Sequence, residues 1–538
     1  MAEVLDYIII GSGFGGSVSA MRLSEKGYSV LVIEKGKHYR NEDFPKTNWN
    51  FKKYFWAPLF GWHGFQKITF FKNTMILSGV GVGGGSLGYA NTHMFPPDEF
   101  FGNPAWSHLC PDKSGWKKTL IPFYEKARRM LGTTRNKAFY RADEVLREVA
   151  GEMNRSSTFN GVDIGVYFGD CDKETDPYFN GLGPMRKGCT ECAGCMVGCR
   201  HNAKNTLDKN YLYFAQKSGA QVIAETKAEK IVFHEGIYSV HTRSGTSSFS
   251  TKKNIFRSRG LVIAGGVLGT MDLLLKQKYK YKTLPHLSKK LGENLRTNSE
   301  MLCGVTAASE KLNQGVSISS VFNPDDSTHI EIVKYPDDSN SMKAFAMIAT
   351  GPGNLLVRPL KLLGNIFLHP VRFAKHIFGK NWATRSVIFL VMQSLDSSMK
   401  MVYKKFPFFR ISIQNKKENR VPSYIDIGQK TMFRYAKKVD GIPQNATTEI
   451  LFNMSSTAHI IGGCPMGKNA DEGMINEKFE AFNYPGMYIL DGSVIPCNLG
   501  VNPSLTITAL SEYAMSLVPE KKGNTIISLE EQMRRVKH

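Results

Sequence analysis

The sequence predicts an α/β protein with a doubly wound parallel sheet, because its first forty residues read as a βαβ unit. The apolar run 7–10 is long enough for a buried parallel strand, and a G-x-G-x-x-G motif follows it at the start of a helix. A second apolar run, 29–33, ends at Glu34. This order of strand, glycine turn, helix and second strand is typical of dinucleotide-binding domains. The glycines of the motif are Gly11, Gly13 and Gly16.

Each part of this motif has its own physical task. Gly11 permits the tight turn, Gly13 lets a pyrophosphate approach the backbone, and Gly16 lets the helix pack closely on the strand. The helix begins near Phe14, and its N-terminal dipole points toward the phosphates. Glu34 lies eighteen residues after the last glycine, where an acidic side chain binds the ribose hydroxyls of an adenosine. The expected binding residues are Gly11, Gly13, Phe14, Gly15, Gly16 and Glu34.

Length and charge narrow the remaining choices. A chain of 538 residues is too long for one hydrophobic core, so we expect at least two domains. Its 69 basic and 47 acidic residues give a net charge of +22, which favours contact with an anionic partner or surface. Nucleic acid is not favoured as that partner, because the lysines are spread along the chain and no basic run lies on a recognisable nucleic-acid-binding module.

Targeting segments are not expected. The glycine motif begins at residue 11, which leaves no room for a cleavable signal peptide before the first strand. No uncharged apolar run reaches eighteen residues, so we expect no transmembrane helix. The expectation is a cytoplasmic protein, with peripheral binding at the inner membrane face left open.

Two segments after the first βαβ unit point to a ligand. Residues 49–71 are dense in aromatic rings, which either form a core beneath a loop or line the entrance for a bulky apolar substrate. Residues 78–88 form a glycine-rich loop, which indicates that backbone comes very close to a flat or phosphorylated ligand. The candidate binding residues in this loop are Gly83, Gly84 and Ser86.

The rest of the pattern makes the nucleotide-binding domain discontinuous. The predicted elements are helices over 120–131, 141–153 and 271–276, a helix that opens at 500–504, and strands over 222–224, 230–233, 260–264 and 486–491. We expect the nucleotide-binding domain to comprise residues 1–45, 75–130, 200–300 and 455–525. We expect a substrate domain to comprise residues 46–74, 131–199 and 301–454.

One part of the substrate domain is both apolar and basic. Residues 341–395 contain no Asp or Glu but seven Lys and Arg residues, together with apolar stretches such as 387–392. Acids occur about once in eleven positions of the whole chain, so a gap of this length is unusual. The segment is either a pair of solvated helices or a basic amphipathic segment that lies on an anionic membrane.

The cysteines indicate a redox or metal site. They number nine, and four of them lie within eleven residues, which does not suit a disulfide framework. The four follow the C-x2-C-x2-C-x3-C spacing of a ferredoxin cluster, although Arg200 replaces the usual proline. Structural zinc would also be satisfied by four thiolates, and unmetallated thiols stay open as well. The four residues are Cys189, Cys192, Cys195 and Cys199.

Several motifs together resemble the glucose-methanol-choline (GMC) oxidoreductases, most closely their cholesterol-oxidase-like bacterial branch, and these motifs span nearly the whole chain. They are the N-terminal motif with Glu34, the loop 83–86, the segments 203–212, 261–270 and 291–295, and the pair His459 and Asn502. Two features depart from the secreted cholesterol oxidases. These are the residues 87–89, where those enzymes tend to carry an asparagine near the flavin, and the cysteine cluster.

The resemblance implies bound FAD, a Rossmann-like domain that binds it, and an α+β substrate domain of the p-hydroxybenzoate-hydroxylase-like type. It also implies oxidation of an alcohol to a carbonyl. Further candidate residues for contact with FAD are Val222, Gly265, Asp491, Gly492, Asn502 and Pro503.

Three residues are candidates for the chemistry. A neutral histidine is the usual acceptor for the hydroxyl proton when hydride leaves an alcohol carbon, and the resemblance implies that His459 has this role rather than a structural one. Asn502 precedes a proline and could simply cap a helix, but the resemblance implies a hydrogen bond to the substrate oxygen. Glu331 is the candidate acid for the double-bond isomerisation that cholesterol oxidases also perform.

The sequence therefore predicts an FAD-dependent oxidoreductase that oxidises the CH–OH group of a bulky apolar alcohol, with a 3β-hydroxysterol as the first choice. The electron acceptor is O2 or a redox partner. Two alternatives stay open. One is an iron–sulfur-linked FAD dehydrogenase of a sugar or polyol, and the other is a membrane-surface flavoprotein that oxidises no alcohol.

Overall fold

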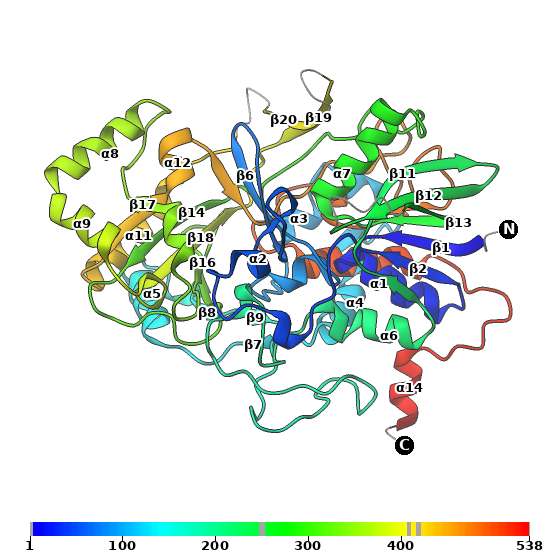
Figure 1. Ribbon diagram of the computed structural model, residues 1–538, viewed down its shortest axis with the longest axis horizontal. Coiled ribbons are helices and arrows are strands. Elements are labelled where there is room, and N and C mark those ends of the chain that lie inside the picture. Colours follow the sequence, from blue (N-terminus) through cyan, green and yellow to red (C-terminus); the bar gives the residue numbers. More distant parts are fainter. Residues whose placement is uncertain (1–3, 247–252, 406–409, 416–420, 537–538) are drawn as a thin grey trace.

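The computed structural model describes residues 4–246, 253–405, 410–415 and 421–536, and two seven-stranded sheets form its framework. Figure 1 shows one sheet beside the N-terminus and the other toward the opposite end of the molecule. The strands of the two sheets contribute to separate buried apolar clusters. The two sheets therefore have separate hydrophobic cores.

The first sheet contains the predicted βαβ unit. Its path is β10-β2-β1-β13-β12-β11, and β23 pairs with β13. The pairings of β10, β2, β1, β13 and β23 are parallel, whereas β11, β12 and β13 pair antiparallel. Three parts of the chain that are far apart in sequence thus share one sheet. The strands are β1 (Val4–Ile10), β2 (Val30–Ile33), β10 (Gln221–Ile223), β11 (Thr226–His234), β12 (Ile237–Ser244), β13 (Lys253–Ile263) and β23 (Met487–Ile489).

Helices cover this sheet, and Figure 1 places α1, α4 and α6 below it and α7 above it. A buried ion pair joins α1 to α13, because the Arg22 guanidinium donates two 2.8 Å hydrogen bonds to the Glu512 carboxylate. This pairing fixes the helix that follows Asn502 and Pro503. The helices are α1 (Phe14–Glu25), α4 (Gly115–Met130), α6 (Tyr211–Lys217), α7 (Gly266–Lys276) and α13 (Ser504–Ser516).

Glycines allow α1 to lie directly against backbone. A Cβ atom on Gly16 would come within 2.0 Å of the Gly11 carbonyl oxygen, and one on Gly15 within 1.7 Å of the Leu490 carbonyl oxygen. Any larger side chain would push the helix away from β1 and from the chain that follows β23. The close packing predicted for Gly16 is therefore confirmed, and Gly15 has an equal need to be glycine.

The second sheet is wholly antiparallel, in the order β17-β21-β14-β18-β16-β15-β8. Helices α5 (Arg141–Glu152) and α11 (Asp426–Lys438) contribute to its apolar core. A Rossmann-like sheet beside an α+β unit is the fold class that the sequence predicts. The strands are β8 (Asn160–Gly161), β14 (Met301–Thr306), β15 (Ile318–Phe322), β16 (Thr328–Val333), β17 (Ala346–Ile348), β18 (Ser386–Gln393) and β21 (Ile442–Ala446).

A small sheet joins the two halves. Its order is β22-β6-β5, with β5 (Gln66–Phe70), β6 (Thr74–Gly79) and β22 (Ser455–Thr457). Strand β22 pairs parallel with β6, and the chain leaves it directly toward His459. In Figure 1 this sheet stands between the two large ones.

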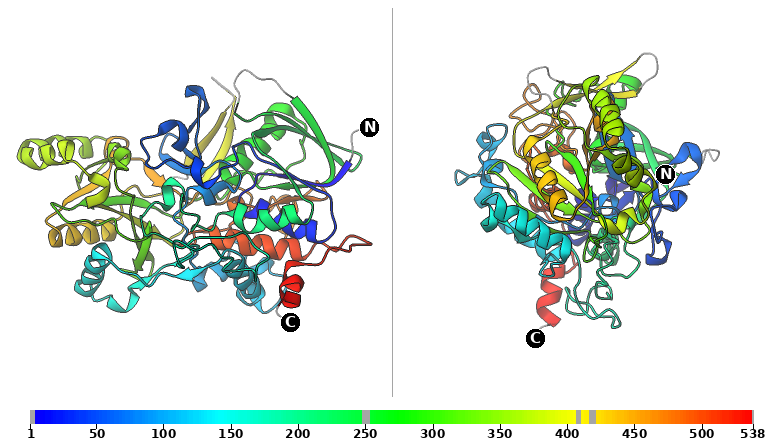
Figure 2. Two further views of the ribbon diagram at one scale, coloured as in Figure 1. Left: turned by 60° about the horizontal axis from the view of Figure 1, so that its bottom comes forward. Right: turned by 90° about the vertical axis from the view of Figure 1, so that its left-hand side faces the viewer.

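The structure corrects the interpretation of 341–395 as one amphipathic segment. The stretch 387–392 belongs to β18, a buried strand in the middle of the second sheet, and β17 also comes from this segment. An unbroken apolar run is equally the pattern of a buried strand, which explains the error. Only α8 (Val357–Leu368) and α9 (Pro370–Phe378) form a largely exposed hairpin, which projects from the molecule in Figure 2.

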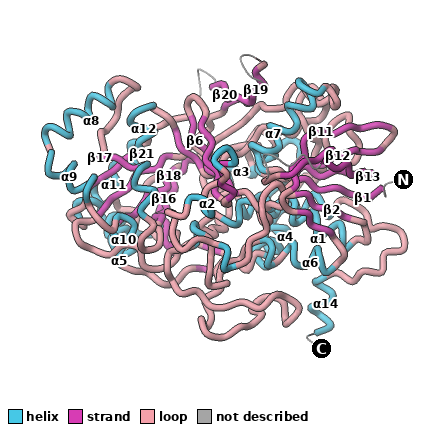
Figure 3. The backbone as a smooth tube through the Cα atoms, viewed as in Figure 1, coloured by secondary structure: helices cyan, strands magenta, loops and turns pink. Residues whose placement is uncertain are grey.

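The four clustered cysteines lie in a long loop. Between β9 (Asp163–Ile164) and α6 the chain has only isolated bridges and short 3₁₀ turns, and Figure 3 draws it largely as loop. Among the helices of the described ranges, none is both long and apolar enough to cross a membrane.

Candidate active site

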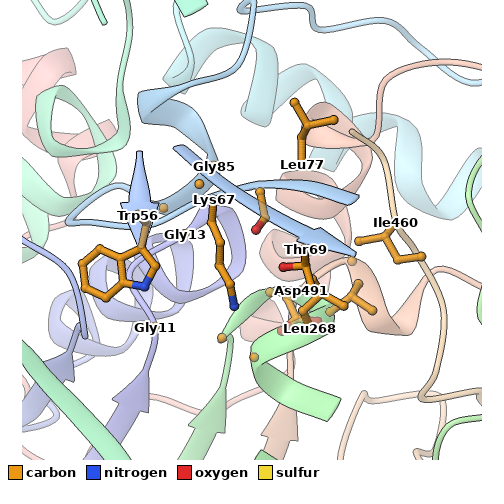
Figure 4. Close-up of a pocket in the computed structure, with 18 of the residues that line it drawn as sticks. Gly11, Gly13, Trp56, Lys67, Thr69, Leu77, Gly85, Leu268, Ile460 and Asp491 are labelled. Carbon is orange, nitrogen blue, oxygen red and sulfur yellow. The ribbon is translucent and has the colours of Figure 1, made fainter. Parts of the chain in front are cut away.

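A cavity of about 1380 Å³ is lined by residues of both large sheets. The glycine turns of the first sheet form one part of its wall, and apolar side chains of the second sheet form another. Figure 4 shows Gly11, Gly13, Gly85 and Asp491 around this space. The apolar lining from the second sheet includes Leu302, Ile318, Val333, Ile388 and Leu390.

The first glycine turn presents bare backbone to the cavity. A Cβ atom on Gly13 would meet no heavy atom within 4 Å, whereas a Cβ on Gly84 would lie 2.6 Å from the Gly13 Cα. The two loops therefore pack on each other and leave open space on the cavity side of Gly13. This space is where a pyrophosphate can approach the start of α1.

Glu34 and Ser12 connect the two glycine loops by hydrogen bonds. One of its carboxylate oxygens accepts hydrogen bonds from the backbone N–H of Ser12, at 3.2 Å, and from the Ser12 hydroxyl, at 2.8 Å. The Ser12 hydroxyl oxygen in turn accepts a bond from the backbone N–H of Gly83, at 3.1 Å. Glu34 lies at the end of β2 and lines the cavity, as expected for a ribose-binding carboxylate.

Most of the residues expected to contact the dinucleotide line the cavity. They are Gly11, Gly13, Phe14, Gly15, Glu34, Gly84, Gly265, Asp491, Gly492, Asn502 and Pro503. A cofactor with two phosphates, an adenosine and a flat ring fits this wall, because bare backbone and a ribose-binding carboxylate stand at one end and polar side chains at the other. These features fit FAD.

Four of the residues predicted to contact the dinucleotide do not line the cavity, which corrects their expected position. Gly16 packs beneath the first turn, and Val222 pairs with Val32 inside the first sheet. The Ser86 hydroxyl donates to the Gly83 carbonyl at 2.7 Å, so both residues shape the loop instead of facing a ligand. The wall near Glu34 is formed instead by 226–229 and 244–246, which carry no motif that the sequence could reveal.

His459 is tied to a buried carboxylate that the sequence analysis missed. Its Nδ1 contacts Glu300, whose second oxygen accepts the backbone N–H of Ala458 at 2.8 Å. Burial by itself would lower the pKa of His459, but the charge of Glu300 and the hydrogen bond to it outweigh burial and raise the pKa. Glu300 immediately precedes β14 and belongs to no recognisable motif, so spacing alone could not identify it.

The contact with Glu300 fixes the orientation of the imidazole. When Nδ1 carries the ring proton and donates a hydrogen bond to Glu300, Nε2 of the neutral ring is an acceptor. Nε2 lies 3.5 Å from Nδ2 of Asn502, and both residues line the cavity. His459 can therefore accept a proton from a ligand in the cavity.

Asn502 is not a helix cap in this structure. Helix α13 starts at Ser504 with no side-chain cap, and the Asn502 amide donates instead to Glu331 Oε2 at 3.2 Å. Its Oδ1 atom is buried and has no hydrogen-bond partner within the described part of the chain. A polar atom left in this state is costly unless a ligand completes it.

Glu331 lies behind Asn502 and not on the cavity wall, which corrects its expected position beside the substrate. It is fully buried in β16, and its Oε1 is 3.1 Å from Nε2 of His329. Residues 329 and 331 alternate along the strand and so share a face. The structure brings His459, Asn502 and Glu331 together. Glu331 contacts Asn502 directly, and Asn502 connects it to His459.

The four clustered cysteines line a second cavity, of about 310 Å³. All four are free thiols, Cys195 is buried and Cys192 is exposed. Within the described ranges, no three His, Cys, Asp or Glu side chains converge on one point that could hold a single metal ion. The backbone N–H of Glu191 donates to the Cys189 sulfur at 3.4 Å.

The aromatic segment 49–71 satisfies both of its interpretations with different residues. Tyr54 and Phe65 are buried in a small apolar cluster, while Trp56, Phe70 and Phe71 line the large cavity. Leu59, at the same wall, is 97% exposed.

Comparison with known proteins agrees with this geometry. Residues 9–40 match the NAD(P)-binding Rossmann-like domain, and residues 185–299 and 411–511 match the two parts of the GMC oxidoreductase model. The crystal structure of a pyridoxine 4-oxidase from Mesorbium loti superposes with a TM-score of 0.61 at 13% identity, covering 95% of this chain and 99% of that one. That likeness concerns the fold alone.

Similarity in sequence is higher for bacterial enzymes. The chain is 42% identical over 535 residues to a cholesterol oxidase of Mycobacterium tuberculosis, covering 96% of this chain and 91% of the relative. It is 40% identical over 546 residues to a cholesterol oxidase of Acinetobacter baumannii, covering 98% and 96%. A long-chain-alcohol oxidase of Arabidopsis thaliana is 22% identical over 573 residues, covering 96% and 68%. The predicted resemblance is confirmed, and the chain belongs to the GMC oxidoreductase family.

Proposed function

We propose that this protein oxidises the 3β-hydroxyl group of a sterol to a ketone with FAD as its cofactor. The observation that carries the proposal is the meeting of His459 and Asn502 with the apolar wall of one cavity. Cholesterol oxidases are among the relatives with 40–42% identity, which supports the same substrate class here.

The apolar wall favours a sterol over a sugar or polyol. Five aliphatic side chains of the second sheet face the cavity, and a sugar would leave its hydroxyl groups unpaired against them. A site with few polar groups beside a large apolar wall suits a ligand that has one hydroxyl on a hydrocarbon frame. His459 and Asn502 line the cavity and are enough to bind one hydroxyl, while Glu300 holds His459 in place from behind.

Each residue of the site has its own part in the proposed reaction. Nε2 of His459 accepts the proton of the substrate hydroxyl, and Glu300 stabilises the imidazolium that forms. Asn502 hydrogen-bonds the substrate oxygen and holds it beside His459. When bound, FAD supplies the acceptor for the hydride. The start of α13, just after Pro503, favours negative charge at that end of the cavity.

Glu331 acts as a positioning residue for Asn502 in this proposal. Its carboxylate accepts the Asn502 amide and does not line the cavity, so direct proton transfer to a sterol would first require Asn502 to move aside. Holding the amide in one orientation leaves Oδ1 directed to a ligand.

The proposal extends to the electron acceptor and to the cysteines. The names of the bacterial relatives support O2 as an acceptor. An iron–sulfur cluster is preferred over zinc for the four cysteines, because their spacing is that of a ferredoxin cluster.

Peripheral membrane binding completes the proposal. The α8–α9 hairpin exposes large apolar side chains, with Leu356 at 73% and Phe367 at 82% exposure. Lys361, Arg372 and Lys375 lie on the same two helices, in a segment without acids. An apolar surface with cations beside it suits anionic headgroups above an acyl layer, where a sterol partitions. The His459 site distinguishes the proposed enzyme from a flavoprotein that binds membranes without oxidising an alcohol, because such a protein has no need of that site.

The pairing of His459 with Glu300 predicts a defined pH response. His459→Gln should keep FAD but slow anaerobic flavin reduction by a sterol about 10²- to 10⁴-fold. The histidine must be neutral to accept a proton, so the rate rises with pH through its pKa. Glu300 raises that pKa, and Glu300→Gln should therefore move the rising limb to lower pH. Stopped-flow spectroscopy across pH measures both effects, with the exposed His108→Gln as control. An unmoved limb in Glu300→Gln would contradict the pairing.

Glu331 is tested by a pair of substitutions. Glu331→Leu removes the acceptor of the Asn502 amide and should slow flavin reduction roughly 10- to 100-fold, the effect of a hydrogen bond to a charged group worth about 1.5–3 kcal/mol. Glu331→Gln keeps an acceptor oxygen and should recover most of the rate. The ratio of conjugated to unconjugated ketone should stay that of the unchanged protein in both variants. Accumulation of unconjugated ketone in Glu331→Gln would instead identify Glu331 as the acid that moves the double bond.

Vesicle binding tests the α8–α9 hairpin. The protein should co-sediment with phosphatidylglycerol vesicles at low salt and be released as salt screens the cations. The double variant Leu356→Glu, Phe367→Glu should weaken partitioning at least about tenfold, because each large apolar side chain contributes about 1.5–3 kcal/mol when buried. Phe433→Glu, at a half-exposed position on α11, is the matched control. If the control variant loses as much vesicle binding, or if the unchanged protein does not bind vesicles, the hairpin is not a membrane-binding surface.

A further inference from the structure

The cysteine cavity and the large cavity share a wall that is one residue thick. Cys195 and Val197 face the small cavity, while Met196 between them faces the large one. The loop 195–197 thus has one cavity on each side. Residues 195–197 form a single short 3₁₀ turn.

A buried lysine forms a second connection through the wall. Lys204 lines the cysteine cavity, and its Nζ donates to the carbonyl oxygens of Cys195, at 2.8 Å, and Tyr89, at 2.8 Å. Tyr89 lines the large cavity. These two hydrogen bonds connect the walls of the two cavities.

The cysteine loop is built to hold its sulfurs in place. Glu191 and Ala193 both have positive φ angles, of 56° and 53°, a conformation that costs energy for residues with a Cβ atom. Two backbone hydrogen bonds to Gly315 hold them there, Ala193 N to Gly315 O at 2.7 Å and Gly315 N to Glu191 O at 3.0 Å. Glu191 N–H is then directed to the Cys189 sulfur. Backbone donors to sulfur tune the potential of thiolate-bound clusters.

The mouth of this cavity is basic. Cys192 is exposed there, and so are Lys46, Arg200 and His201. The described residues that line the cavity include no Asp or Glu. With a net charge of +22 on the whole chain, this mouth favours an acidic partner.

We propose that the cysteine cavity is an electron exit, in which the four thiolates hold a [4Fe–4S] cluster and an acidic one-electron carrier protein docks over Cys192. The inference rests on the proposed alcohol oxidation, because oxidation of each alcohol to a ketone releases two electrons and two protons. The electrons pass the shared wall one at a time and reduce two carrier molecules, and the protons go to solvent. Zinc has no redox chemistry and would not serve.

The first test concerns the cluster itself. Protein purified without oxygen should contain about four iron and four sulfide per FAD, the composition of the proposed cluster. Reduction with dithionite should give the electron paramagnetic resonance signal of a reduced [4Fe–4S] cluster. Cys195→Ala should lose the signal, while Cys110→Ser, outside the cysteine loop, should keep it. Zinc in place of iron, or thiols without metal, would overturn the proposal.

The second test concerns the docking surface. With sterol and no oxygen, the protein should reduce cytochrome b5, an acidic haem protein, and the double variant Lys46→Glu, His201→Glu should slow this at least about tenfold at low salt. Lys437→Glu, on α11 outside the cavity lining, makes a charge change of the same kind and should have no effect. The rate at which cytochrome c, a basic haem protein, is reduced should not fall in the double variant. Equal rates for the unchanged protein and the double variant with cytochrome b5 would overturn the docking surface.

The two proposals fail in distinguishable ways. Flavin bleaching by sterol is recorded in the same samples, so bleaching without any reduction of cytochrome would overturn the electron exit and leave the alcohol oxidation standing. If sterol bleaches no flavin, dithionite supplies the electrons instead. Reduction of the cytochrome that still depends on Cys195 and the rim cations would then support the exit while the proposed substrate fails.

Discussion

The buried contact between Glu300 and His459 is the interaction on which the candidate site depends. Glu300 immediately precedes β14 of the antiparallel sheet, and His459 lies on the loop that follows β22 of the small sheet between the two halves. A carboxylate buried without a partner costs several kcal/mol, so the two elements are held at the distance that keeps the pair together. The same contact leaves Nε2 directed to the cavity and raises the pKa of the imidazole.

Close backbone packing defines the other part of the cavity. Gly15 and Gly16 let α1 lie against bare carbonyl groups, and Gly84 lies against Gly13, so the wall near the first turn has almost no side chains. The second sheet supplies aliphatic residues instead. The cavity thus combines a backbone wall, which suits phosphates and a flat ring, with an apolar wall, which suits a hydrocarbon. The catalytic candidates lie where these walls meet.

The sequence was sufficient where one local signal has one structural meaning. The glycine motif and Glu34 predicted β1, α1 and β2, and the pair His459 and Asn502 came from motifs of the family. Glu300 was missed because a lone acid before a strand has no signature. Glu331 was found but placed beside the substrate, because sequence does not tell which of two layers a strand residue occupies. The stretch 387–392 was misjudged because a buried strand and an apolar membrane-facing run have the same composition.

We propose above all that a sterol gives the hydride of its carbinol carbon to FAD in this cavity and its hydroxyl proton to His459. The most direct measurement is the absorption spectrum of the purified protein without oxygen, recorded before and after addition of a 3β-hydroxysterol, its 3α epimer or a sugar alcohol. The account predicts that the flavin band bleaches with the 3β-hydroxysterol, more slowly with the epimer, and not with the sugar alcohol. A spectrum that the 3β-hydroxysterol leaves unchanged, or that only the sugar alcohol bleaches, would contradict it.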